Sequence, residues 1–383
     1  MQQFNFPTTI YFGDGALAGL ARYLHEKTHK KALLVTDRTL VELGLVEQVV
    51  NVIELHIDVV IFADVHANPI EQDVEQGRAT FIDNRCDCII ALGGGSPMDV
   101  AKVIKVATTH PMPLAQYDDA LGGDKLIVND MPPLYAIPTT AGTGSEVGRS
   151  GVIILRDSGQ KTIIFAPQLM PDIAVLAPEL TVNLPTHITA ATGIDAFTHC
   201  LEAFFAPVFH PMADGIALEG MRLCLTHLAT CVKRGQDINA RGQMQLAATM
   251  GATAFQKGLG MTHSLAHPLS AEFNIHHGLA NALLLPYVLA FIEQQVNLDA
   301  EQISKINRVK QLFAEQGMVC DSLAQACETW FTELGIRFGL KHQDIAESDL
   351  SMLADKAFAD PCHHSNLIVV NRDDLFAVYQ RAW

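Results

Sequence analysis

The chain has 383 residues, of which 49% are hydrophobic and 18% charged, and its formal net charge is −16. This composition is that of a compact folded protein and excludes a disordered chain. The negative charge, with no basic run longer than Lys30–Lys31, argues against binding to nucleic acid or to an anionic membrane surface.

Three further features concern targeting and compartment. The first fifteen residues lack a positive segment followed by an apolar one, so we expect no signal peptide. The apolar stretch near Leu283–Ile292 is too short to span a bilayer and contains Pro286. The eight cysteines are scattered without zinc-finger spacing. We therefore expect a cytoplasmic protein with reduced thiols.

The first half of the chain alternates short β-branched runs with helical patterns such as Thr39–Leu55 and Glu71–Asn84. This alternation predicts βαβ units and a mostly parallel sheet, that is, an α/β domain over residues 1–180. The predicted strands are Lys31–Thr36, Val59–Ala63, Cys88–Leu92 and Leu134–Pro138.

Two runs near the end of this half, Val152–Leu155 and Lys161–Phe165, are separated by five polar residues and predict a β-hairpin. Beyond about Thr181 strand-like runs nearly vanish, which predicts an all-helical domain over residues 181–383. The predicted helices cover residues 189–206, 212–233, 239–256, 261–271, 279–295, 301–316, 321–335 and 349–358.

A glycine-rich turn, Gly93–Ser96, follows the third predicted strand, and Pro97 then opens a helix. Glycines allow a ligand to approach the backbone, and free N–H groups at a helix start attract anions. The pattern matches neither common nucleotide-binding fingerprint, so it indicates either a phosphate site or an ordinary turn.

Hydroxyl side chains gather in a second loop, over residues 137–151, where Thr139, Thr140 and Ser145 stand among glycines. Such a loop at a strand's end suits a dinucleotide, although capping residues of a polar loop look the same. Asp37 ends the first predicted strand, where a carboxylate either accepts both ribose hydroxyls of NAD or caps the next helix.

Metal-ligating residue types occur at helical spacing in the second half. Asp195 and His199 stand at i and i+4 in an apolar helix, and His263 and His267 repeat that spacing. His276 and His277 follow, so that four histidines fall within fifteen residues, against about 0.6 for an average window of this chain. A carboxylate and several imidazoles suit Fe²⁺, Zn²⁺ or Mn²⁺ as metal ligands. Alternatively, Asp195 and His199 form a hydrogen-bonded pair in the core without a metal.

Four motifs occur along the chain in the order GGGSPMDVAK, IPTTAGTGSEV, TAATGIDAFTHCLEAF and GLGMTHSLAHPLSAEFNIHHGLANA. Together they resemble the iron-containing (group III) alcohol dehydrogenases over essentially the whole chain. Segments 204–220, 233–241 and 254–260 resemble the branch of 4-hydroxybutyrate dehydrogenases. The resemblance implies the dehydroquinate synthase-like fold, with an N-terminal α/β dinucleotide-binding domain and an all-α metal-binding domain.

The same resemblance implies roles for individual residues. His267 would lie beside the nicotinamide and handle protons, while His276 stands where the family most often has proline and so has no assigned role. The implied metal ligands are Asp195, His199, His263 and His277. The implied cofactor-binding residues are Asp37, Gly94, Gly95, Ser96, Asp99, Thr139, Thr140 and Ser145.

The implied activity is the NAD-dependent interconversion of a small primary alcohol and its aldehyde, with Fe²⁺ or alternatively Zn²⁺. An ω-hydroxy acid such as 4-hydroxybutyrate is the alternative substrate. Arg149 and Lys257 would then either pair with its carboxylate or be ordinary cations at the surface or the rim of the cleft. Glycerol dehydrogenase-like and maleylacetate reductase-like enzymes, and a non-catalytic dinucleotide-binding protein, are further alternatives. The resemblance also implies a homodimer or larger assembly.

Overall fold

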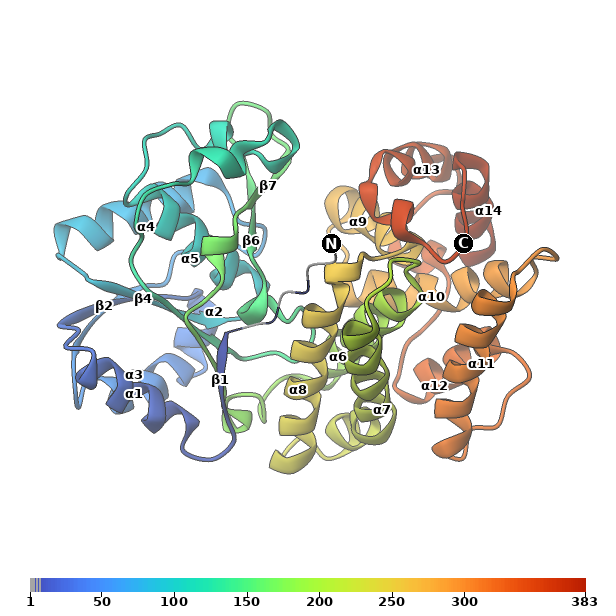
Figure 1. Ribbon diagram of the computed structural model, residues 1–383, viewed down its shortest axis with the longest axis horizontal. Coiled ribbons are helices and arrows are strands. Elements are labelled where there is room, and N and C mark those ends of the chain that lie inside the picture. Colours follow the sequence, from blue (N-terminus) through green and yellow to red (C-terminus); the bar gives the residue numbers. More distant parts are fainter. Residues whose placement is uncertain (1–3, 5, 7) are drawn as a thin grey trace. The chain divides into compact units, whose positions relative to one another are not determined.

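The computed structural model describes residues 4, 6 and 8–383 of the chain, which divide into two compact units (Figure 1). The α/β unit comprises Phe6–Thr140 and Gly144–Thr181. The helical unit comprises Ala141–Thr143 and Val182–Trp383, together with Phe4. The short segment Ala141–Thr143 therefore leaves the α/β unit and packs with the helices.

A six-stranded sheet, parallel throughout, forms the centre of the α/β unit, with the strand order β1-β8-β5-β4-β2-β3. Its strands are β1 (Thr9–Phe12), β2 (Lys31–Val35), β3 (Asp58–Phe62), β4 (Cys88–Gly93), β5 (Leu134–Pro138) and β8 (Ile173–Leu176). Alternate residues of β2, β4 and β5 contribute to two separate hydrophobic clusters, so both faces of the sheet are buried. A strand that is buried on both faces consists of consecutive apolar residues, and such runs predicted β2, β4 and β5 from the sequence.

Helices cover both faces of this sheet. α1 (Ala16–Glu26) and α3 (Leu45–Ile53) contribute to one hydrophobic cluster, and α4 (Glu71–Asp83) and α5 (Gly95–Ala107) to the other. The helix predicted over residues 39–55 is broken in two, because Gly44 adopts a left-handed conformation (φ 73°) between α2 (Arg38–Glu42) and α3. The predicted hairpin is confirmed as the antiparallel pair β6 (Ser150–Ile154) and β7 (Lys161–Phe165).

The helical unit contains one large hydrophobic core, to which nine α-helices contribute within the described residues. Among residues 4, 6 and 8–383, no helix is both long and apolar enough to cross a membrane. The nine are α6 (Thr186–Phe205), α7 (Pro211–Lys233), α8 (Ile238–Ala254), α9 (Met261–Phe273), α10 (His277–Glu293), α11 (Ala300–Glu315), α12 (Leu323–Glu333), α13 (Leu350–Ala359) and α14 (Arg372–Ala382). The predicted fold class, α/β followed by all-α, is thus confirmed.

Candidate functional site

Helix α6 is buried on every side, since each residue from Thr189 to Phe205 is shielded from solvent. It packs against α7, α8 and α10, and a helix that is apolar all round belongs in a core. Asp195 and His199 lie one turn apart on this helix and share a face. A carboxylate at such a depth is costly unless it is paired or binds a cation.

Two more histidines reach Asp195 from other helices. His263 lies in the first turn of α9, and His277 is the first residue of α10. The start of α10 approaches α6 closely because the next residue is Gly278. A Cβ at Gly278 would lie only 2.3 Å from the carbonyl oxygen of Ala191 and 3.2 Å from Cβ of Asp195. Glycine at this position therefore lets His277 stand beside Asp195.

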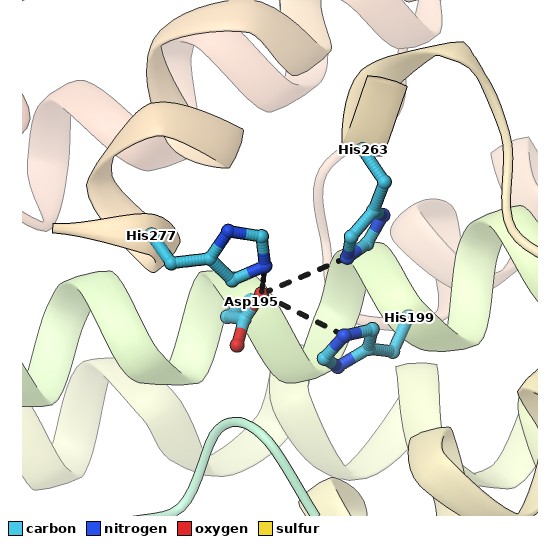
Figure 2. Close-up of side chains that lie close together, drawn as sticks. All are labelled: Asp195, His199, His263 and His277. Atoms are coloured by element: carbon cyan, nitrogen blue, oxygen red, sulfur yellow. Dashed lines mark ion pairs between the residues drawn. The ribbon is translucent and has the colours of Figure 1, made fainter. Parts of the chain in front are cut away.

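The four side chains converge on one point (Figure 2). The Nε2 atoms of the three imidazoles lie 3.8 Å (His199), 4.0 Å (His263) and 3.5 Å (His277) from Oδ1 of Asp195. One ligand atom from each of the four residues lies within 4.8 Å of all the others. Metal–ligand bonds of about 2.1 Å in a tetrahedral site place ligand atoms about 3.4 Å apart. The donor set and its spacing therefore fit a single divalent cation.

The ionisation of these groups also suits a cation. Burial disfavours the charged form of Asp195, but the three imidazoles and the amide of Asn281 outweigh it and lower the pKa to about 2. Burial lowers the pKa of His199 to about 4 and holds the pKa of His277 well below its ordinary value. Burial opposes the charged form of His263, but Glu202 outweighs it and raises the pKa, so a cation that binds there would displace a proton. An ionised carboxylate and neutral imidazoles are the forms in which these side chains bind metals.

One side of the cluster is open to solvent. The side chains of Asp195 and His263 are 2% and 1% exposed, whereas His277 is 31% exposed. His267, whose ring stacks on that of His277, is 43% exposed. Solvent therefore reaches the group at His277 and His267, while Asp195 and His263 are enclosed by protein.

A buried carboxylate fixes the ring of His263. Oε2 of Glu202 lies 2.6 Å from Nδ1 of His263, and the Glu202 carboxylate also accepts backbone N–H bonds from Gly260 and Thr262. Burial opposes ionisation of Glu202, but these partners lower its pKa. With Nδ1 protonated toward Glu202, the lone pair of His263 stands on Nε2, which faces Asp195. Glu202 is not among the site residues expected from the sequence, although it lies about one turn beyond His199 on α6.

His267 makes a different contact from the four residues of the cluster. Its Nδ1 lies 2.7 Å from Oδ2 of Asp360, which leaves Nε2 as the nitrogen available to other groups. Oδ1 of Asp360 accepts hydrogen bonds from Ser264 and from the backbone N–H of Cys362. Burial of Asp360 is outweighed by these partners, and its pKa is lowered. Asp360 was also not expected from the sequence, because it lies far along the chain from His267.

The glycine turn lies at the carboxyl end of β4, where Gly93 has φ 149° and Gly94 precedes the first turn of α5. Gly95 and Ser96 begin this helix, two residues earlier than Pro97 suggested, and the hydroxyl of Ser96 donates to the carbonyl of Ala67. The free N–H groups at this helix start form the kind of site that binds phosphate.

The second loop lies against this turn. Thr139 donates its backbone N–H to the carbonyl of Gly93, and a Cβ at Gly94 would lie 3.5 Å from the side chain of Thr140. Ser145 lies farther along the loop, and its hydroxyl is 3.3 Å from Oδ1 of Asp99. Burial raises the pKa of Asp99 to about 6. The structure therefore brings together the predicted residues of both loops within the α/β unit.

A buried lysine, Lys102, connects this loop to α5. Its Nζ donates to the carbonyl and the hydroxyl of Ser145, at 2.7 and 2.8 Å, and to the carbonyl of Ser150 at 3.1 Å. Burial lowers its pKa to about 8, against the opposing charges of Asp99 and Glu146. Lys102 is the last residue of the first of the four motifs, but nothing in the sequence pattern indicates that its charge is buried.

The remaining predicted residues have mixed outcomes. Asp37 caps α2 by accepting the N–H of Leu40, which is the alternative foreseen for it. Lys257 is one of the two cations considered for a substrate carboxylate, and its ammonium group is buried and paired with Asp214 beside the carbonyl of Phe204. Its charge is therefore already neutralised within the helical unit. Arg149 is half-buried over the ring of Phe165, and His276 is exposed just before α10.

Comparison with known proteins is consistent with these observations. Residues 7–178 match the model of the family described as iron-containing alcohol dehydrogenase, and residues 189–383 match that of the family's C-terminal part. The chain is 38% identical to 4-hydroxybutyrate dehydrogenase of Cupriavidus necator, covering 94% of each chain. It is 33% identical to NAD-dependent methanol dehydrogenase of Bacillus methanolicus, covering all of both. The crystal structure of 1,3-propanediol oxidoreductase superposes with a TM-score of 0.91 at 31% identity, covering 100% of each chain.

A parallel sheet with a glycine turn, joined to a helical unit with a three-histidine, one-carboxylate cluster, defines the class of metal-dependent dinucleotide dehydrogenases. The chain belongs to the iron-containing alcohol dehydrogenase family. It is therefore an oxidoreductase, and the family predicted from the four motifs is confirmed. The predicted cofactors, NAD and iron, agree with the family description and with the NAD-dependent relative.

Proposed function

We propose that this protein uses NAD and a divalent cation to interconvert small primary alcohols and their aldehydes by hydride transfer. The observation that carries the proposal is the convergence of Asp195, His199, His263 and His277 on one point with the spacing of a metal site. When bound, the cation supplies Lewis acidity for the negative charge on the alcohol oxygen, and NAD⁺ accepts the hydride. Fe²⁺ is proposed from the family, and Zn²⁺ suits the same donors.

His267 is proposed to move the proton that the alcohol loses. Asp360 holds Nδ1, so Nε2 is the atom that takes the proton from the substrate or from a water molecule. His267 is the more exposed of the two stacked rings, His267 and His277, and can pass the proton to solvent. An imidazole is suited to both steps, because its ring nitrogens can accept and donate protons.

The α/β unit is proposed as the dinucleotide-binding domain, over residues 1–180, and the helical unit as the metal-binding domain, over residues 181–383. The pyrophosphate would bind at the start of α5, where backbone N–H groups are free. Asp37 would accept the ribose hydroxyls in addition to capping α2. The proposed contacts to the cofactor are made by Asp37, Gly94, Gly95, Ser96, Asp99, Thr139, Thr140 and Ser145.

Formation of NADH from NAD⁺ and a panel of primary alcohols tests the activity. Metal-stripped protein should produce no NADH, and addition of Fe²⁺ or Zn²⁺ should restore production. Absence of NADH with every alcohol and either metal would contradict the proposal and favour a non-catalytic dinucleotide-binding protein.

An ω-hydroxy acid is a second candidate substrate, favoured by the 38% identity to 4-hydroxybutyrate dehydrogenase. The sequence offers two cations for a substrate carboxylate, Arg149 and Lys257. Because Lys257 is paired with Asp214, Arg149 is the remaining candidate. We expect Arg149→Ala to lower kcat/KM for 4-hydroxybutyrate and to leave that for 1-butanol, an alcohol of equal carbon number, unchanged. A wild-type kcat/KM for 4-hydroxybutyrate no higher than for 1-butanol would eliminate this candidate.

A cytoplasmic location is supported by the cysteines, all eight of which are free thiols. A homodimer or larger assembly is proposed from the resemblance to the family. Light scattering of the purified protein measures the assembly, and a monomeric mass at micromolar concentration would contradict it.

A further inference from the structure

A fifth polar side chain, Asn281, lies within the metal cluster. It stands one turn after His277 on α10 and is fully buried, with 0% of its surface exposed. Its Nδ2 donates to Oδ1 of Asp195 at 2.8 Å and lies 3.3 Å from Nε2 of both His263 and His277. The amide therefore contacts the ligand atoms of three of the four residues.

The orientation of the amide follows from the groups around it. Oδ1 of Asp195 is a hydrogen-bond acceptor, and Nδ1 of His263 faces Glu202, so that Nε2 is the ring nitrogen turned toward the amide. Only the NH₂ side of an amide can donate to such acceptors, and a hydrogen bond to a charged acceptor is among the stronger ones. The oxygen of Asn281 has no hydrogen-bond partner within residues 4, 6 and 8–383, although it is buried. The side-chain oxygen of Asn281 is thus left without a hydrogen bond, while the side-chain nitrogen contacts the cluster.

We propose that Asn281 is a positioning residue of the metal centre, which holds Oδ1 of Asp195 at the point where the three Nε2 atoms converge. This inference rests on the proposed metal site. The amide donor lies 2.8 Å from Oδ1 of Asp195, whereas the three imidazole nitrogens lie 3.5 Å or farther away, so the amide makes the closer contact that can fix the rotation of this carboxylate. Groups that orient metal ligands in this way contribute about 10- to 100-fold in metal affinity.

The substitution Asn281→Leu tests this role, because leucine keeps the branching of asparagine but has no N–H. We expect the dissociation constant for Zn²⁺, measured by competition with a chromophoric chelator, to rise about 10- to 100-fold. The visible absorption spectrum of the Co²⁺-loaded protein should change as well, since the ligand field depends on the position of Asp195. Asn281→Ala offers the same comparison if the leucine variant does not fold.

Thr198→Val is the matched control. Thr198 is a buried residue of α6 whose hydroxyl donates to the helix carbonyl of Ile194. Its replacement removes a buried polar group near Asp195 without touching a proposed ligand, so Zn²⁺ affinity and the Co²⁺ spectrum should stay unchanged.

The outcomes separate this inference from the proposed function. A folded Asn281→Leu protein with wild-type Zn²⁺ affinity and Co²⁺ spectrum would overturn the positioning role while leaving the metal site intact. Failure of the wild-type protein itself to bind Zn²⁺, Co²⁺ or Fe²⁺ would overturn the metal site, and the role of Asn281 with it.

Discussion

Single side chains behind the proposed ligands decide how the site works, and Glu202 is the clearest example. Its carboxylate accepts from Nδ1 of His263 and from two backbone N–H groups, so it fixes both the tautomer and the rotation of that ring. A carboxylate behind a ligating histidine also raises the basicity of the imidazole.

Glu202→Gln should therefore weaken metal binding about 10- to 100-fold, because the amide cannot balance a developing positive charge on His263. Metal content after dialysis against a chelator measures the effect. The matched control is Glu219→Gln, which alters a half-exposed carboxylate paired with Arg222 on α7. Equal metal retention by the two variants would contradict the role assigned to Glu202.

His263 and His267 lie four residues apart on α9 but have different proposed tasks. His263 is buried in the cluster, whereas His267 is part-exposed and held by Asp360. We expect His267→Ala to lower kcat about 100- to 10,000-fold, the range for loss of a general acid or base, with near-normal metal content. His263→Ala should lose the metal. Elemental analysis beside steady-state kinetics checks both, and the reverse pattern would exchange the two assignments.

At the scale of elements, the approach of α10 to α6 sets the position of His277. Gly278 permits that approach, since its Cβ would collide with the carbonyl of Ala191. Gly278→Ala should displace the start of α10 and reduce metal content, even though alanine favours helix formation. Gly215→Ala on α7, where a Cβ would meet nothing within 4 Å, is the control and should leave metal content and stability intact. Full metal loading of both variants would refute this account.

In the α/β unit, Lys102 holds the loop that carries Ser145 against α5. Lys102→Met removes three hydrogen bonds from a charged donor, each worth about 1.5–3 kcal/mol, and should loosen the loop. We expect NAD⁺ affinity, measured by calorimetry, to fall by about tenfold while metal content is unchanged. Lys125→Met, on an exposed residue, serves as control, and unaltered NAD⁺ affinity in Lys102→Met would exclude the proposed link.

The sequence predicted most but not all of the elements. Helices α6 to α13 repeat apolar residues over several turns and were predicted, whereas the four-residue strands β1 and β8 and the eleven-residue helices α1 and α14 were not. The helix predicted over residues 39–55 failed at Gly44, because a positive φ there ends one helix and begins another. A short strand contains too few residues to show a clear apolar repeat. A tight turn depends on local dihedral angles, which an apolar repeat does not report.

The candidate site divides in the same way. Asp195 and His199, or His263 and His267, are recognisable because helical spacing places them on one face. Glu202, Asp360 and Lys102 bond to partners 61, 93 and 43 residues away, and such contacts arise only from tertiary packing. The ligand types were thus predictable from the chain, while the side chains that orient them were not.

Across the whole molecule, the two proposed sites belong to different units. The cluster of Asp195 and its three imidazoles lies in the helical unit, and the glycine turn with Lys102 lies in the α/β unit. Loss of the metal should therefore leave NAD⁺ binding to the α/β unit detectable. The proposed reaction nevertheless requires both the metal and NAD⁺. Turnover should therefore be lost when either the metal or NAD⁺ is absent, even though each binds to its own unit.

Stepwise return of Fe²⁺ to metal-stripped protein, under anaerobic conditions with NAD⁺ and 1-butanol, measures whether turnover depends on a metal ion at the Asp195 cluster. We predict that NADH formation rises linearly with added Fe²⁺ and levels off at one equivalent per chain. The His263→Ala protein should show no rise over the same range, since its Asp195 cluster has lost a ligand. Undiminished NADH formation by the stripped wild-type protein, or an equal rise in the variant, would contradict the assignment of the metal to Asp195, His199, His263 and His277.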